Sequence, residues 1–236
     1  MNKRKRILPV VFLLLAALLL TGCTKRAKET DEITTGIDVA RYQGTIDWTR
    51  VATSSVDFAM VRLGYRSYAD GSIVEDPNAR YNLQEAQKNN IMLGAYFFSS
   101  AVNTTEAVEE ANWAADILDH YSINYPIAYD CEGFLEETSR QYDMSVKERT
   151  DVALAFLKQI EKRGYEGMFY ASKNDMEKFH RWDMSRIEKH YKVWVAQYPE
   201  VGYPTTEKSS YTGPHAMWQH TTKGVVPGIT QNVDLD

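Results

Sequence analysis

Strand-like and helix-like segments alternate along most of this 236-residue chain, and this alternation restricts the folds that it can adopt. Short apolar runs with the two-residue period of a strand are followed by stretches with the apolar spacing of an amphipathic helix. The strand pattern occurs at residues 36–40, 58–63, 91–98, 126–132, 167–171, 192–197, 216–219 and 233–235. Strands that alternate with helices favour a parallel sheet with crossover helices. The pattern therefore predicts a single-domain α/β fold, a compact (β/α) TIM-like barrel with some crossovers reduced to loops.

Capping residues mark where the predicted helices begin. Three starts are predicted, at Asp76-Pro77, at Asn103 with Glu106, and at Ser145 with Glu148. Asp76 is expected to cap its helix and Pro77 to occupy the first turn. The other two pairs have the three-residue spacing of a polar cap followed by an acidic residue.

The segment Pro126-Ile-Ala-Tyr-Asp-Cys-Glu132 brings two carboxylates to the end of an apolar strand. Because side chains alternate along a strand, Asp130 and Glu132 face one side and Cys131 faces the other. Two carboxylates in one pocket repel each other when both are ionised, so one of them tends to keep its proton near neutral pH. Such a group can protonate a leaving group. In an arbitrary protein, a D-x-E sequence is more often a solvated pair of acids that serves solubility.

Polar residues at other strand ends favour the functional interpretation. The full set is Asp38, Asp130, Glu132, Gln197, Gln219 and Asp234. In a parallel barrel the strand ends converge on one face, and catalytic groups come from the ends of different strands. We therefore expect these side chains to share a site. Asp234 lies near the end of the sequence, and a solvated loop position is a serious alternative for it.

The first 23 residues have the pattern of a bacterial export signal. Residues 3–6 are four cations, and the apolar run that follows, residues 7–20, is shorter than the ~20 residues that cross a bilayer. Residues 20–23 resemble a lipobox, which predicts removal of residues 1–22, lipidation of Cys23 and an extracytoplasmic position on the bacterial cell membrane. A plain secretory signal and an uncleaved anchor are the alternatives. Residues 23–33 are interpreted as a polar tether and residues 34–236 as the folded domain.

Composition excludes several other classes of protein. Removing residues 1–22 takes four of the 27 Lys and Arg residues and none of the 32 acids, which leaves a net charge of −9 and argues against a nucleic-acid partner. Without Cys23, only Cys131 remains, so we expect no intramolecular disulfide and a buried thiol. The five histidines lack metal-ligand spacing and no nucleotide-binding motif is present. We therefore expect a monomer without a metal or cofactor.

The motifs, in their order along the chain, resemble glycoside hydrolase family 25, the lysozymes of the cellosyl and Chalaropsis types. The resembling segments are Gly36-Ile-Asp-Val-Ala-Arg-Tyr-Gln-Gly44, Ile46-Asp47-Trp48, residues 58–64, Gly94-Ala-Tyr-Phe-Phe98, Asp130-Cys-Glu132, Phe169-Tyr-Ala171, Trp194-Val-Ala196, Met217-Trp-Gln219 and Val233-Asp-Leu235. The resemblance implies an irregular, flattened (β/α) barrel. It also implies cleavage of the β-1,4 bond between N-acetylmuramic acid and N-acetylglucosamine in peptidoglycan.

The same resemblance implies roles for the acids. Glu132 would be the general acid, and Asp130 would hold the substrate's acetamido group as its carbonyl oxygen attacks the anomeric carbon. Direct inversion remains an alternative to this route. Asp38 and Asp234 would shape the local field and orient water or substrate. Two departures affect substrate positioning more than the acids: Ala40 replaces a residue that is usually Ser, and Asp236 stands where Asn is common.

Aromatic residues near strand ends are candidates for contact with sugar rings. The predicted substrate-binding residues are Tyr65, Tyr96, Tyr170, Trp194, Gln197 and Gln219. Tyr129 is excluded because it precedes Asp130 and so faces the opposite side of its strand.

Two other functions stay open at this point. One is a lipid-anchored module that binds peptidoglycan without cutting it, although the intact acids argue against it. The other is a hydrolase of chitin-like N-acetylglucosamine chains, which would share acetamido-assisted chemistry.

Overall fold

The computed structural model describes residues 33–236, and the predictions made for residues 1–32, including Cys23, lie outside this region. The described chain folds as one α/β unit over Thr34–Asp236. Within residues 33–236, no helix combines the length and the apolar composition that crossing a bilayer requires.

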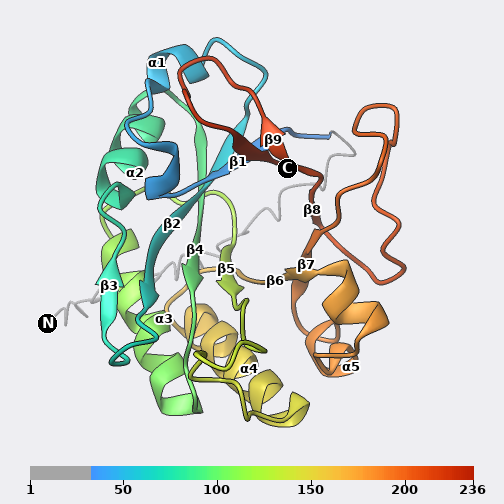
Figure 1. Cartoon of the computed structure of the whole chain (residues 1–236). Helices are drawn as coiled ribbons and strands as arrows, with labels where there is room; N and C mark the ends of the chain where they lie inside the picture. The colour runs from blue at the N-terminus through green and yellow to red at the C-terminus, as the bar shows by residue number, and fades with distance from the viewer. Residues whose placement is uncertain (1–32) are drawn as a thin grey trace, which may run out of the picture. The chain divides into compact units, whose positions relative to one another are not determined.

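Strands and helices alternate through this unit, as Figure 1 shows. The strands are β1 (Gly36–Val39), β2 (Phe58–Arg66), β3 (Ile73–Glu75), β4 (Met92–Phe98), β5 (Ile127–Asp130), β6 (Gly167–Ser172), β7 (Lys192–Ala196), β8 (Met217–Gln219), β9 (Thr221–Gly224) and β10 (Val233–Leu235). The α-helices are α1 (Trp48–Val51), α2 (Ala79–Lys88), α3 (Thr104–Leu118), α4 (Val146–Lys162) and α5 (Met184–Ile187). Two short helical turns, η1 (Arg41–Gln43) and η2 (Asn174–Lys178), complete the described elements.

The strands form a single curved sheet in the order β8-β7-β6-β5-β4-β2-β1-β10-β9, with β3 paired to β2. Neighbours from β8 to β1 run parallel, whereas β10 is antiparallel to β1 and β9 is antiparallel to β10. The two ends of this order, β8 and β9, are separated along the chain only by His220. The chain itself therefore links the two ends of a nearly closed, barrel-like sheet.

This architecture confirms the predicted fold class, a single-domain α/β barrel-like fold. All eight predicted strands are present, but β3 and β9 were not predicted. The last predicted strand, β10, runs antiparallel to β1, so the structure is not a regular barrel of eight parallel strands.

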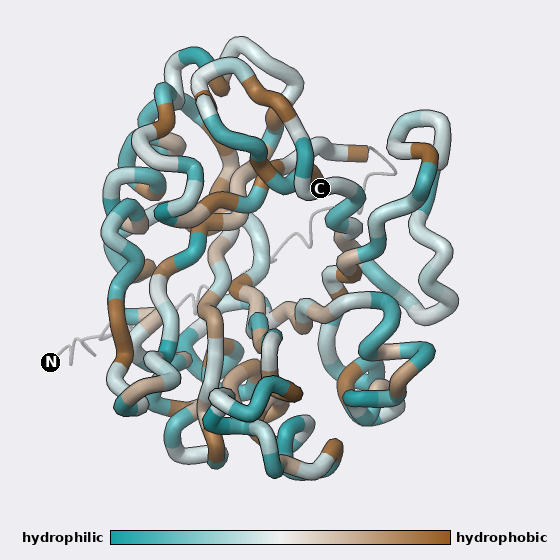
Figure 2. The backbone as a smooth tube through the Cα atoms, viewed as in Figure 1, coloured by the Kyte–Doolittle hydropathy of each residue, from teal (hydrophilic) through white to brown (hydrophobic). Residues whose placement is uncertain are grey.

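Side chains alternate between the inside of the barrel and the outside that the helices cover. The inner apolar cluster consists of Phe58, Met60, Tyr96, Ala128, Met168, Tyr170, Trp194, Ala196 and Met217. The intervening strand residues belong to a larger cluster with residues of α2, α3 and α4, which lie outside the strands in Figure 1. Apolar colour recurs along the central strands in Figure 2. The two-residue period of the strands thus places alternate side chains in the inner apolar cluster and in the outer core.

Two of the three predicted helix starts are confirmed in detail. Asn103 Oδ1 accepts a hydrogen bond from the Glu106 N–H at 2.9 Å at the start of α3. Ser145 and Glu148 form a reciprocal capping box at the start of α4, with Ser145 Oγ accepting from the Glu148 N–H and Glu148 Oε2 accepting from the Ser145 N–H.

The prediction that Asp76 caps α2 is wrong in its boundary. The helix begins at Ala79, and Asn78 occupies the cap position. Asp76 Oδ1 accepts from the Asn78 N–H at 2.9 Å, but Oδ2 binds the Arg62 guanidinium at 2.6 Å and also accepts the Arg41 N–H. The Asp76 carboxylate therefore forms a buried ion pair with Arg62 of β2 and does not cap α2.

Replacing Phe156 with Ala should destabilise the domain by about 3–5 kcal/mol, because a large side chain is removed from a packed interior. Phe156 is fully buried on α4, with its ring 5.3 Å from that of Tyr129 between centroids. Urea denaturation followed by circular dichroism measures the loss. Phe179→Ala is the matched control, because the Phe179 side chain is 47% exposed and its removal should cost far less. Equal losses in the two variants would contradict the assigned core.

Candidate active site

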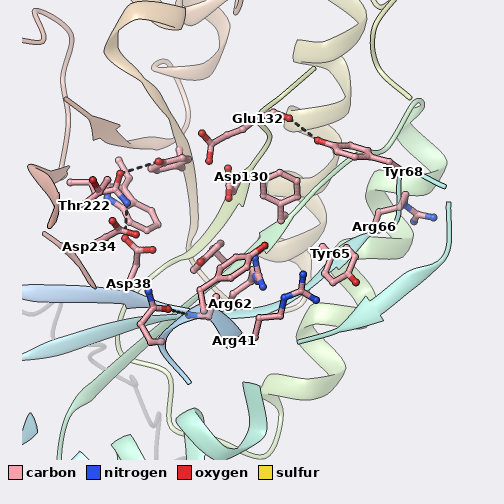
Figure 3. A pocket seen from close by; sticks show the side chains of 18 of the residues that line it. Asp38, Arg41, Arg62, Tyr65, Arg66, Tyr68, Asp130, Glu132, Thr222 and Asp234 are labelled. Carbon is pink, nitrogen blue, oxygen red and sulfur yellow. Dashed lines mark hydrogen bonds between the residues drawn. The ribbon is translucent and has the colours of Figure 1, made fainter. Parts of the chain in front are cut away.

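A cavity of about 700 Å³ opens where the ends of the strands meet. Its lining contains Asp38, Ala40, Arg41, Tyr42, Gln43, Arg62, Tyr65, Arg66, Ser67, Tyr68, Ala69, Tyr96, Phe98, Asp130, Glu132, Tyr170, Trp194, Tyr198, Gln219, Thr222 and Asp234. All four predicted acids are in this set, and Figure 3 shows them around one space. The inner apolar cluster lies along the same inward-facing side of the strands.

Asp130 and Glu132 line the cavity together, as strand alternation requires. Between them, Cys131 points to the outer core, where it is 2% exposed and its Sγ donates to Gln141 Oε1 at 2.8 Å. Burial raises the pKa of the Cys131 thiol, as expected of an unreactive structural cysteine. The prediction of a buried Cys131 thiol is confirmed.

The two carboxyls of this pair differ in access. Asp130 is only 4% exposed, whereas Glu132 stands at the mouth of the cavity and reaches solvent. Burial, followed by the charge of Glu132, raises the pKa of Asp130 well above its ordinary value, and Arg62 opposes this shift. The surrounding protein also desolvates the Glu132 carboxyl and raises its pKa, while its interaction with the neighbouring Asp130 opposes that shift. The coupled pair therefore retains protons at a higher pH than isolated acids do.

Asp38 and Asp234 form a second pair on the adjacent wall. They are direct register partners across the antiparallel strands β1 and β10, the position at which like charges repel most strongly. Burial raises the pKa of Asp38 well above its ordinary value, and the charges of Asp236 and Asp234 add to the effect. Burial raises the pKa of Asp234 to about 6.

Gln219 lines the cavity, but both polar ends of its amide are engaged by protein groups. Its Oε1 accepts from Tyr170 Oη at 3.0 Å and from Tyr198 Oη at 2.6 Å. Its Nε2 donates to Asp38 Oδ2 at 2.6 Å. This network fixes the orientation of the amide and of the Asp38 carboxyl.

The aromatic residues predicted to bind substrate divide into two groups. Tyr96, Tyr170 and Trp194 are at most 8% exposed, and their rings pack edge to face, at 4.7 Å for Tyr170 with Trp194. They shape the inner wall of the cavity. Tyr65 is more exposed and stands nearer the mouth.

The prediction that Gln197 belongs to the site is wrong in its placement. Strand β7 ends at Ala196, and Gln197 is absent from the cavity lining. Its Oε1 accepts from Ser209 Oγ and from the Ser210 N–H, both at 3.2 Å, so it holds the long connection to β8. Ala196 faces the inside of the barrel, so the next residue, Gln197, faces the outside.

Several lining residues were not predicted. They are Ala40, Arg41, Tyr42, Gln43, Arg62, Arg66, Ser67, Tyr68, Ala69, Phe98, Tyr198 and Thr222. Arg62 could have been found, because it continues the inward phase of Phe58 and Met60. Tyr65 shares the lining with Arg62 because the β2–β4 register shifts between Arg62 and Gly64, which resets the alternation.

The segment that carries Glu132 is attached to the barrel at three points. Tyr68 Oη donates to the Glu132 backbone oxygen at 2.9 Å, as Figure 3 shows. Further along, Arg140 binds Glu106 of α3 at 2.8 Å, and Gln141 Nε2 donates to the Ala101 backbone oxygen at 2.6 Å. These contacts hold the loop at both of its ends and so fix the position of Glu132. Among residues 33–236, no group of three or more His, Cys, Asp and Glu residues is arranged to hold a metal ion.

Paired carboxyl groups around a cavity at the strand ends of an α/β barrel are an arrangement that can hydrolyse a glycosidic bond. Comparison with known families agrees, because residues 37–229 match the family described as Glycosyl hydrolases family 25. The chain belongs to this family of glycoside hydrolases.

Individual relatives extend this comparison. The protein YegX of Escherichia coli, described as uncharacterized, is 28% identical over 203 residues, which cover 85% of this chain and 68% of that protein. The autolytic lysozyme of Clostridium acetobutylicum is 23% identical over 201 residues, which cover 85% of this chain and 54% of that enzyme. The modular autolysin LytC of Streptococcus pneumoniae, solved in complex with a synthetic peptidoglycan ligand, matches with a TM-score of 0.69 and 25% identity. That match covers 86% of this chain and 46% of LytC, so this chain spans less than half of LytC.

The elevated pKa of Asp234 makes stability depend on pH with a defined sign. In the folded protein the pKa is about 6, above the ordinary 3.8, so the folded state binds more protons between these values and the free energy of unfolding falls as pH rises through this window. Asp234→Asn removes the titrating group. The stability of the variant relative to the unsubstituted protein should therefore rise up to about pH 6 and become constant near pH 7.

Urea midpoints measured between about pH 5 and pH 7 test the prediction. Asp70→Asn is the matched control, because hydrogen bonds from Ser72 lower the pKa of Asp70 and keep it ionised in both states above pH 5. Its effect on stability should stay constant over the range. If the stability difference between Asp234→Asn and the unsubstituted protein were also independent of pH, the pKa of Asp234 would not be raised by burial, and the prediction would be wrong.

Proposed function

We propose that this chain hydrolyses the β-1,4 bond between N-acetylmuramic acid and N-acetylglucosamine in peptidoglycan, with Glu132 as general acid. The observation that carries the proposal is the Asp130–Glu132 pair at the end of β5, opening into a cavity that Asp38 and Asp234 also line. The names of the relatives support the substrate, since one is an autolytic lysozyme and another was solved with a peptidoglycan ligand.

Glu132 is better placed than Asp130 to protonate the leaving oxygen. Its carboxyl stands at the open side of the cavity, where a bound glycan can reach it, and its raised pKa favours the protonated form. In the first step its proton moves to the glycosidic oxygen as the bond from that oxygen to the anomeric carbon breaks. The resulting carboxylate can then take a proton from the attacking water.

Asp130 is suited to the acetamido group next to the reacting carbon. Its Oδ1 is buried and has no hydrogen-bond partner among the described residues. A substrate N–H that donated to this oxygen would satisfy it and would orient the acetamido carbonyl oxygen toward the anomeric carbon. The carboxylate would also stabilise the positive charge that develops on the cyclised acetamido group.

Asp38 and Asp234 act on the field of the site in this proposal. Gln219 fixes the Asp38 carboxyl on the wall that faces Asp130, and Asp234 beside it, with a pKa of about 6, carries negative charge at neutral pH. A field of this sign favours an oxocarbenium-like transition state over the neutral substrate.

Replacing Glu132 with Gln should lower hydrolysis of purified peptidoglycan by about 10²–10⁴-fold, because Gln cannot donate the proton to the leaving oxygen. New reducing ends measure the rate, and mass spectrometry of the products identifies the bond that is cut. Glu137→Gln is the matched control, because Glu137 is an exposed acid of the same loop that does not line the cavity.

The outcomes separate the candidate functions. The control should retain the unsubstituted rate. Binding of peptidoglycan without release of reducing ends would replace the proposal with a binding module. Faster cleavage of N-acetylglucosamine chains than of peptidoglycan would replace the substrate with chitin-like glycan.

We further propose that the enzyme works outside the cytoplasm, attached to the membrane by lipid on Cys23. The support is the sequence of residues 1–23, with its cations, short apolar run and lipobox-like end. Cys23→Ser should move the protein from the membrane fraction to the soluble fraction and abolish metabolic labelling with a fatty acid. Cys131→Ser is the control that should leave both unchanged, since the Cys131 thiol is buried. Labelling that survives Cys23→Ser would reject the anchor.

A further inference from the structure

The cavity has two walls of opposite charge. The four acids lie toward β5, β1 and β10, and three arginines, Arg41, Arg62 and Arg66, stand together with Tyr65 on the other side in Figure 3. The chain as a whole carries more acids than cations, so cations gathered on one wall need a specific explanation.

Two of the three arginines are paired within the protein. Arg62 binds the Asp76 carboxylate at 2.6 Å, and both groups are buried. Arg66 binds Glu110 at 2.7 Å and Glu109 at 2.8 Å. Their charges are therefore largely compensated, and they hold the wall in place.

Arg41 is different, because no acidic side chain within residues 33–236 lies within ion-pair distance of its guanidinium. The residue is exposed and lines the cavity. Its guanidinium lies 5.2 Å from the ring centre of Tyr42 and 5.8 Å from that of Tyr65. The aromatic faces restrict the cation while its hydrogen-bond donors stay accessible.

Hydrogen bonds from the backbone of Ala40 and Arg41 to side chains anchor the turn that carries the guanidinium. The Arg41 N–H donates to Asp76 Oδ2 at 3.0 Å, so the carboxylate that pairs with Arg62 also anchors this residue. At the start of the same turn, the Ala40 N–H donates to Gln43 Oε1 at 2.8 Å. An accessible guanidinium on an anchored turn loses little conformational freedom when it binds a ligand.

We propose that Arg41 binds a carboxylate of the substrate glycan and so favours acidic muramic-acid glycans over neutral ones. This inference rests on the proposed peptidoglycan substrate. The planar guanidinium matches a carboxylate with two parallel hydrogen bonds. It also offsets the repulsion that the ionised members of the acidic wall exert on an anionic substrate.

Two carboxylate sources on peptidoglycan share this chemistry. One is the lactyl group of muramic acid, which is free only where no peptide is attached. The other is the set of carboxylates on the stem peptide. Soluble glycan fragments with and without peptide distinguish them, and amidation of each fragment supplies a neutral counterpart of nearly the same shape.

The experiment measures dissociation constants by calorimetry in the Glu132→Gln chain, which leaves the fragments uncut. Arg41→Gln should weaken binding of the carboxylate fragments roughly fivefold, which corresponds to about 1 kcal/mol for an accessible ion pair. It should leave binding of the amidated fragments nearly unchanged, and Arg41→Lys should restore part of the loss. Arg50→Gln is the control, because Arg50 is an exposed arginine on α1 outside the cavity lining.

Each outcome decides the inference. A loss confined to peptide-free fragments assigns the lactyl carboxylate, and a loss confined to peptide-bearing fragments assigns the stem peptide. Equal loss for charged and amidated fragments, no loss, or no binding of any fragment overturns the role of Arg41. A separate assay tests the proposed function: if the chain with Glu132 unchanged released no new reducing ends from peptidoglycan, that function would be wrong.

Discussion

Mutual repulsion between carboxyl groups on the inner face of one curved sheet is the constraint on which this structure depends. Asp38 faces Asp234 across two strands, and Asp130 lies next to Glu132 at the end of another. Burial removes the water that would screen these charges, so the pKa of each rises. Such an arrangement persists only where the surrounding fold is stable enough to bear its cost.

Two apolar layers supply that stability. The outer core packs the strands against α2, α3 and α4, and the inner cluster fills the barrel along the inward face of the strands. Because both faces of most strands are buried, a slip of one residue would turn the inward-facing acids into the outer core and the outer apolar residues into the cavity. The positions of the acids are therefore set by the packing of residues that never contact a ligand. The loop that carries Glu132 is less regular, and it relies on individual bonds from Tyr68, Arg140 and Gln141.

Local periodicity was sufficient to predict eight of the ten described strands and to place the acids at strand ends. Alternation placed Asp130 and Glu132 on the inside and Tyr129 on the outside, where Tyr129 is fully buried against Phe156 and Phe169. The same rule places Gln197 on the outside, because Ala196 faces inward, and the prediction failed because Gln197 was chosen for its position at the strand end and not for its phase. The rule gave no account of Tyr65, whose direction depends on a shift in the pairing of β2 with β4. A register shift is a property of two strands together, so one strand's sequence does not contain it.

Long-range pairing explains the other differences. Asp76 has the local sequence of a helix cap, but an arginine fourteen positions earlier along the chain takes its carboxylate. The strands β3 and β9 are short, and β9 is polar, so neither carries an apolar pattern. They form because β2 and β10 offer unpaired edges, and these edges are fixed only once the sheet has assembled.

Asp236 stands where the family resemblance leads us to expect Asn, and its side chain lies beside the Asp38 wall. Its Oδ1 accepts from Trp194 Nε1 at 2.9 Å, a bond that the side-chain oxygen of Asn would accept equally well. Burial raises the pKa of Asp236 well above its ordinary value. When protonated, it has one acceptor oxygen and one donor, and so it reproduces the hydrogen bonding of Asn. When ionised, it adds a charge that raises the pKa of Asp38 further, so this residue makes the proton affinity of the Asp38 wall depend on pH in a way that Asn does not.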